Sequence, residues 1–216
     1  MMRTKRPQRG SLACGLLVLG VVWIGPLPEL SRHSFAAHMT MHMAVVAVVA
    51  PLVAAAIAGS RLDPVRARPQ RLSPIVASVI EFLVVWAWHA PALHHAARHS
   101  TALLVVEQAS FLFVGLLVWL AAFGGSPDQR RERAAAGIGG LLLTSMHMTL
   151  LGVLLALAAR PLYPHAAQVA FGLTPLQDQH LGGVLMLSFG GVAYLTGALV
   201  LLADLLRDRR EVFARD

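Results

Sequence analysis

The sequence predicts an all-α integral membrane protein, a bundle of six transmembrane helices with both termini in the cytoplasm. Hydrophobic residues make up 56% of the 216 residues and charged residues only 13%, whereas soluble domains contain about 25% charged residues. The apolar residues also form six long stretches, each near the ~20 residues that a spanning helix requires. The expected spans are 11–27, 35–58, 73–92, 101–124, 137–159 and 181–204.

Proline residues shape the first two spans. Span 11–27 is shortened by Pro26, and we expect it to be retained rather than cleaved as a signal peptide. Span 35–58 contains no Asp, Glu, Lys or Arg. We expect this span to kink near Pro51, because proline removes a hydrogen bond from the helix.

The third and fourth spans each contain one carboxyl group. Glu81 lies ~13 Å below the outer end of span 73–92, and Glu107 lies ~9 Å below the outer end of span 101–124, at 1.5 Å per residue. An ionisable group at such a depth is costly and indicates a functional site. The alternative is that each carboxyl group only hydrogen-bonds a neighbouring helix.

The last two spans are nearly free of charge. Span 137–159 contains His147 near the middle of the membrane. Before span 181–204, Asp178 is placed to cap the helix, and Gly182-Gly183 allows a neighbouring helix to approach closely.

The basic residues predict the orientation. Of the 18 Lys and Arg, 15 lie in four segments that six spans would place on one side of the membrane: 1–9, 61–71, 126–133 and 207–216. The positive-inside rule assigns that side to the cytoplasm of a bacterial inner membrane. The chain then divides into a basic N-terminus (1–10), one transmembrane domain (11–206) and a basic tail (207–216). We attribute the net charge of +7 to orientation and to contact with membrane lipid, not to nucleic-acid binding.

Histidine and methionine residues gather toward the opposite, outer side. His38 and His42 are four residues apart and therefore share one helix face, about 6 Å apart along the axis. Met39 and Met41 lie beside them. Imidazole and thioether together suit copper, and thioether favours Cu(I), although methionine is also a common filler of apolar helices.

These observations predict an outer-facing copper site. Its candidate ligands are His38, His42, Glu107, Glu81, His89 and His147, with Met39, Met41, Asp178 and His180 as additional candidates. We expect the remaining outer histidines to be interfacial side chains: His94, His95, His99 and His165. The single Cys14 excludes a multi-cysteine metal site within the chain, and the sequence contains no motif of a hydrolase or transferase.

Five motifs in order resemble the multi-helix membrane family CtaG, which is linked to assembly of caa-type cytochrome c oxidase. The motifs are His38-Met39 with His42, Trp88-His89-Ala90-Pro91, Glu107, Pro161-Leu162-Tyr163-Pro164, and Asp178-Gln179 with Gly182-Gly183. The resemblance covers residues 30–200. It implies a non-enzymatic factor that acts with oxidase subunits in the cytoplasmic membrane.

The sequence departs from that family at two positions. Gln108 stands where the family commonly has histidine, and His180 stands where it often has glutamine. If a metal site in the family uses the histidine that Gln108 replaces, His147 and His180 are the candidates to take its place in this chain. No haem is expected, but three alternatives stay open: an integral membrane b-type cytochrome ligated by His42 and His147, a copper or proton transporter with Glu81 and Glu107 as relay groups, and a metal-free chaperone.

Overall fold

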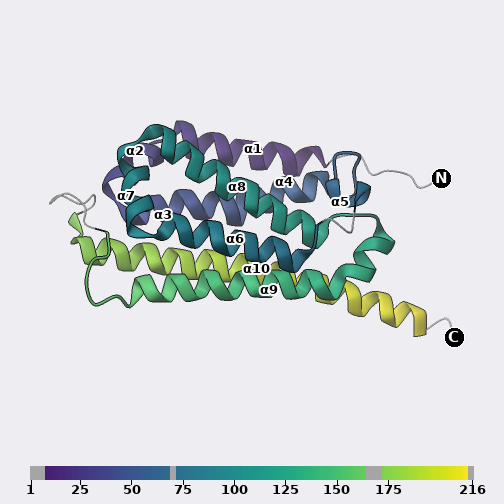
Figure 1. Cartoon of the computed structure of the whole chain (residues 1–216). Helices are drawn as coiled ribbons and strands as arrows, with labels where there is room; N and C mark the ends of the chain where they lie inside the picture. The colour runs from purple at the N-terminus through teal and green to yellow at the C-terminus, as the bar shows by residue number, and fades with distance from the viewer. Residues whose placement is uncertain (1–7, 69–71, 164–171, 214–216) are drawn as a thin grey trace.

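In the computed structural model, which describes residues 8–68, 72–163 and 172–213, every regular element is a helix (Figure 1). The elements are α1 (Arg9–Ile24), α2 (Leu27–His33), α3 (Phe35–Met43), the π-helical segment η1 (Ala44–Val49), α4 (Ala50–Ile57), α5 (Pro64–Ala67), α6 (Pro74–His89), α7 (Pro91–His99), α8 (Thr101–Phe123), α9 (Pro127–Ala156) and α10 (Pro175–Phe213).

The described helices include four to six candidate membrane spans. Four are long and apolar enough to cross a bilayer as they stand: Phe35–Ile57, Thr101–Phe123, Asp128–Ala156 and Pro175–Arg207. Two further spans are possible if each of two bent helix pairs counts as one span. The pair α1–α2 is bent by 51° and the pair α6–α7 by 70°. The all-helical class is thus confirmed, and the expected six spans match the upper count.

The helices differ from the expected spans in two respects. The irregularity near Pro51 is the π-helical segment η1, which widens the helix just before the proline. Helices α9 and α10 also extend beyond the expected spans 137–159 and 181–204. A capping box formed by Ser126 starts α9 early, and the Arg-rich, Glu-containing flanks are good helix formers.

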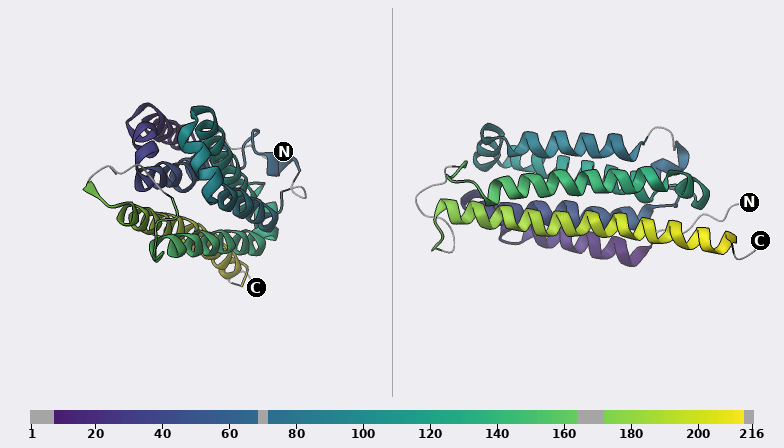
Figure 2. Two further views of the ribbon diagram at one scale, coloured as in Figure 1. Left: turned by 60° about the vertical axis from the view of Figure 1, so that its left-hand side comes forward. Right: turned by 90° about the horizontal axis from the view of Figure 1, so that it is seen from below.

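The long helices run along one common axis (Figures 1 and 2). Helices α9 and α10 pack side by side over most of their length. Their close approach depends on glycine: a Cβ built on Gly183 would lie 2.5 Å from the Ala156 backbone nitrogen, and one on Gly152 would lie 2.9 Å from the Gly183 carbonyl oxygen. The backbones therefore touch where side chains would otherwise separate them.

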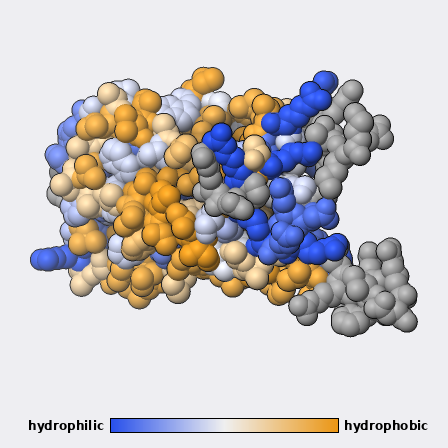
Figure 3. All heavy atoms as spheres, turned by 45° about the vertical axis from the view of Figure 1, so that its right-hand side comes forward, coloured by the Kyte–Doolittle hydropathy of each residue, from blue (hydrophilic) through white to orange (hydrophobic). Residues whose placement is uncertain are grey.

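The two ends of the bundle differ in character. Both chain ends lie at one end (Figure 1), where hydrophilic side chains gather in Figure 3, whereas hydrophobic side chains cover much of the middle. At the opposite end, the short helices α2 and α7 fold across the bundle. Pro91, which has no backbone N–H, separates α6 from α7, and Arg98 of α7 donates from Nη1 to the Ser31 carbonyl oxygen of α2 at 2.7 Å.

Candidate metal centre

The first turn of α3 is fixed by an aspartate from the far end of the sequence. Asp178 of α10 accepts hydrogen bonds from the Ser34 hydroxyl at 2.7 Å, the Phe35 backbone N–H at 2.5 Å and the Ala36 N–H at 3.2 Å. The Ser34 side chain in turn caps α3 by accepting from the Ala37 N–H. These bonds set the position from which α3 presents its histidines.

Four histidines from three helices converge below α2 and α7, and we name them the imidazole cluster: His38 and His42 of α3, His89 of α6 and His94 of α7. The ring centroids of His38 and His94 are 5.1 Å apart, those of His42 and His89 5.6 Å, and those of His38 and His89 6.5 Å. Each residue is at most 5% exposed. The cluster is therefore an enclosed group of imidazoles.

His89 is held in one tautomer. Its Nδ1 lies 2.7 Å from the Val85 carbonyl oxygen, and because a carbonyl only accepts, Nδ1 carries the hydrogen. Its Nε2 is left with a free lone pair, which is the arrangement of a metal-binding histidine. Tyr163 donates its hydroxyl to the His89 carbonyl oxygen at 2.7 Å, and burial raises the pKa of this hydroxyl, so the donor remains protonated.

Several nitrogen atoms of the cluster are buried without a hydrogen bond. They are Nδ1 of His38, both ring nitrogens of His42 and Nε2 of His89. An unsatisfied buried polar atom costs about 1–3 kcal/mol, and native proteins contain few of them. Their concentration in one place makes the imidazole cluster a candidate metal site.

Glu107 of α8 links the cluster to a buried arginine. Its Oε2 accepts from Arg98 Nη2 at 3.0 Å, and its Oε1 lies 3.5 Å from His38 Nε2. Glu107 is 0% and Arg98 5% exposed. The arginine balances the carboxylate charge through one oxygen, while the other oxygen faces the imidazoles.

The donor atoms fit a metal ion with modest movement. Ligand atoms of His38, His94 and Glu107 all lie within 4.8 Å of one another. Three ligand atoms at ~2.1 Å from one ion lie about 3.5 Å apart, so a shift of each atom by less than ~1 Å would complete the set. Imidazole with one carboxylate suits copper, zinc or iron.

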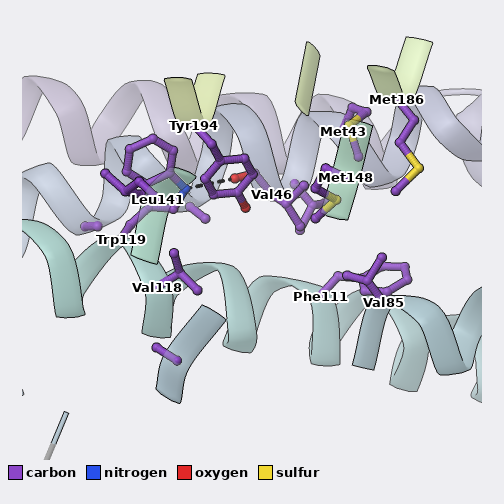
Figure 4. Packing of buried hydrophobic residues seen from close by; sticks show 14 of the residues in the cluster. Met43, Val46, Val85, Phe111, Val118, Trp119, Leu141, Met148, Met186 and Tyr194 are labelled. Carbon is purple, nitrogen blue, oxygen red and sulfur yellow. Dashed lines mark hydrogen bonds between the residues drawn. The ribbon is translucent and has the colours of Figure 1, made fainter. Parts of the chain in front are cut away.

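Glu81 lies apart from the cluster. It precedes His89 by eight residues on α6, or about 12 Å along the axis. Tyr194 of α10 donates its hydroxyl to Glu81 Oε1 at 2.6 Å. In Figure 4 Tyr194 lies beside Trp119, at the opposite side of the view from Val85. The structure thus matches the alternative reading of a hydrogen bond to a neighbouring helix.

The remaining candidates also lie outside the cluster. His147 packs its ring against Phe82, next to Glu81, with centroids 5.4 Å apart. Met39 faces Gly182 of α10, and Met41 is buried in the apolar core. Both Asp178 oxygens are occupied by α3, and His180 Nε2 lies 2.9 Å from the Ala158 carbonyl oxygen. His165 falls outside the described residues.

Sequence reasoning missed two residues of this centre, His94 and Arg98. His94 was expected at the interface, yet it is 1% exposed. Because α6 and α7 are bent by 70° relative to each other, the face of α7 that carries His94 and Arg98 is buried. The spacing of four residues between His94 and Arg98 was the available signal, but His95 and His99 have the same spacing and both are exposed.

Fold and site together define a multi-pass helical membrane protein with an enclosed imidazole and carboxylate centre. A family model, cytochrome c oxidase caa3 assembly factor (Caa3_CtaG), matches residues 3–208. The chain belongs to this family, and the assembly role suggests a non-catalytic protein. No curated protein and no solved structure matches the chain significantly.

Proposed function

We propose that this protein binds copper in the imidazole cluster and passes it to a copper-containing subunit of the oxidase that it helps to assemble. The observation that carries the proposal is the set of buried, unpaired nitrogens of His38, His42 and His89, together with Glu107, which lies 3.5 Å from His38. Membership of an oxidase assembly family makes copper the relevant metal among those that imidazole binds.

The location of the cluster supports delivery on the outer side of a bacterial cytoplasmic membrane. The cluster lies at the end of the bundle opposite both chain ends (Figure 1). Most Lys and Arg belong to the segments at the chain-end side, which the positive-inside rule assigns to the cytoplasm. Copper held at the other end would face an oxidase subunit outside.

The haem alternative has less support. A b-type cytochrome would ligate haem through His42 and His147 on opposite faces of one macrocycle. His42 packs against Phe111, with centroids 4.0 Å apart, and His147 packs against Phe82. The two rings therefore belong to separate groups of side chains.

The test uses a strain in which this chain is the only member of its family. We expect a His38→Ala/His42→Ala double variant to accumulate normally in the membrane while the oxidase lacks copper, as measured by metal analysis and by the oxidase spectrum. The matched control is His95→Ala/His99→Ala, which removes two exposed imidazoles of the same spacing. A fully copper-loaded oxidase in the first strain would refute the proposal.

A further inference from the structure

A second site, which shares no lining residue with the imidazole cluster, extends toward the end of the bundle near the chain ends. It is a cavity of about 510 Å³ bounded by α4, α8, α10 and the start of α9. This volume is within the range of ~300–1,000 Å³ that small-molecule sites occupy. The cavity exists because α10 packs closely along α3 but only loosely along α4.

Small residues line the cavity along two helices. On η1 and α4 the lining residues recur at helical spacing from Ala47 to Ala58, and on α10 they recur from Ala193 to Val200. The stretch from Ala47 to Ala58 measures about 16 Å at 1.5 Å per residue. One leaflet of a bilayer has about 15 Å of hydrocarbon, so the cavity has the length of a lipid chain in one leaflet.

Aromatic side chains form one wall of the cavity. Trp119 and Phe123 of α8 line it, and the Trp119 ring stacks on Tyr194 with centroids 5.1 Å apart (Figure 4). Trp119 also donates Nε1 to the Val46 carbonyl oxygen at 3.2 Å, so its polar atom is already satisfied. The surface that faces the cavity there is therefore apolar.

The mouth of the cavity is polar and positive. Arg130 and Gln8 are among its lining residues, and no lining residue in the described part of the chain is acidic. The Nε of Arg130 is buried without a hydrogen-bond partner. A guanidinium group with a free donor suits a phosphate, which it can bind with two parallel hydrogen bonds.

We propose that this cavity binds one anionic phospholipid from the adjacent leaflet. One acyl chain lies between α4 and α10, and the phosphate lies on Arg130. Charge and shape both favour this occupant: the positive group is at the mouth, where a headgroup would lie, and the apolar channel has the length of one leaflet. The proposal is independent of copper binding.

The experiment offers the full-length protein two lipids with identical acyl chains. Detergent-purified protein is equilibrated with mixed micelles of phosphatidylglycerol and phosphatidylcholine in equal amounts, and retained lipid is counted by native mass spectrometry. We expect about one retained phosphatidylglycerol per chain. A single basic residue near the membrane surface should give it about a fivefold preference over phosphatidylcholine.

Three variants assign the retained lipid to the cavity. Arg130→Ala should remove the preference, whereas Arg131→Ala, an adjacent arginine that is not among the lining residues, should keep it. Ala58→Leu/Ala193→Leu fills the channel and should lower retention of both lipids, with circular dichroism to verify folding. Retention of neither lipid by the wild-type protein, or a preference that survives Arg130→Ala, would overturn the proposal; the former result would favour a partner helix as the occupant.

Discussion

Arg98 and Glu107 form a buried ion pair, with Nη2 and Oε2 3.0 Å apart. The pair joins α7 to α8 and holds the second carboxylate oxygen beside His38. A second hydrogen bond from Arg98 reaches the Ser31 carbonyl oxygen of α2. One arginine therefore connects the short helices that cover the imidazole cluster with the carboxylate beneath them.

Substitution of Arg98 by alanine should destabilise the protein strongly. It leaves Glu107 as a buried carboxylate without its partner, which costs about 3–5 kcal/mol. The matched control is Arg61→Ala, because Arg61 is exposed and substitutions at such surface positions change stability by no more than about 0.5 kcal/mol. Thermal unfolding in detergent measures both variants, and equal losses of stability would contradict the role assigned to Arg98.

Asp178 should matter for stability as the partner of α3, not as a ligand. Asp178→Ala leaves two backbone N–H groups and the Ser34 hydroxyl without their acceptor, at about 1–3 kcal/mol for each buried group. We expect a clear loss of thermal stability, together with weaker metal binding because α3 carries His38. Asp204→Ala, the same change at an exposed position of α10, should leave both properties unchanged.

Replacing glycine by alanine should lower the stability of the protein at one position and raise it at another. A Cβ on Gly183 would lie 2.5 Å from the Ala156 nitrogen, so Gly183→Ala must separate α9 from α10 and should cost about 1–3 kcal/mol. A Cβ on Gly20 of α1 meets nothing within 4 Å, and Gly20→Ala should gain up to ~1 kcal/mol of helix propensity. Unfolding temperatures that fall equally in both variants would argue against close packing at Gly183.

The residues of this centre that lie on the long helices could be predicted from helix periodicity. Those that lie beyond the bend between α6 and α7 could not. His38 and His42 share a face because they are four residues apart, and the depth of Glu107 placed it near them. His94 and Arg98 could not be placed, since whether α7 folds back depends on the bend after His89. Local spacing also did not reveal that Glu81 had a partner, because Tyr194 lies 113 residues away.

The orientation of the bundle is a separate prediction. A fluorescent protein fused after residue 216 should fold and fluoresce, and alkaline phosphatase at the same position should be inactive, because the basic segments keep this end in the cytoplasm. Phosphatase inserted after Ser100, between α7 and α8, should be active and serves as the reciprocal control. Active phosphatase at residue 216 would reverse the assignment of the imidazole cluster to the outer side.

The most direct measurement of the central claim is the metal content of detergent-purified protein, taken together with its absorption spectrum. The account predicts about one copper per chain and no haem band. Copper should be lost in His38→Ala/His42→Ala and in His94→Ala, but retained in His95→Ala/His99→Ala. Wild-type protein from copper-replete membranes that contains no copper, or copper that persists when His38 and His42 are removed, would contradict the account.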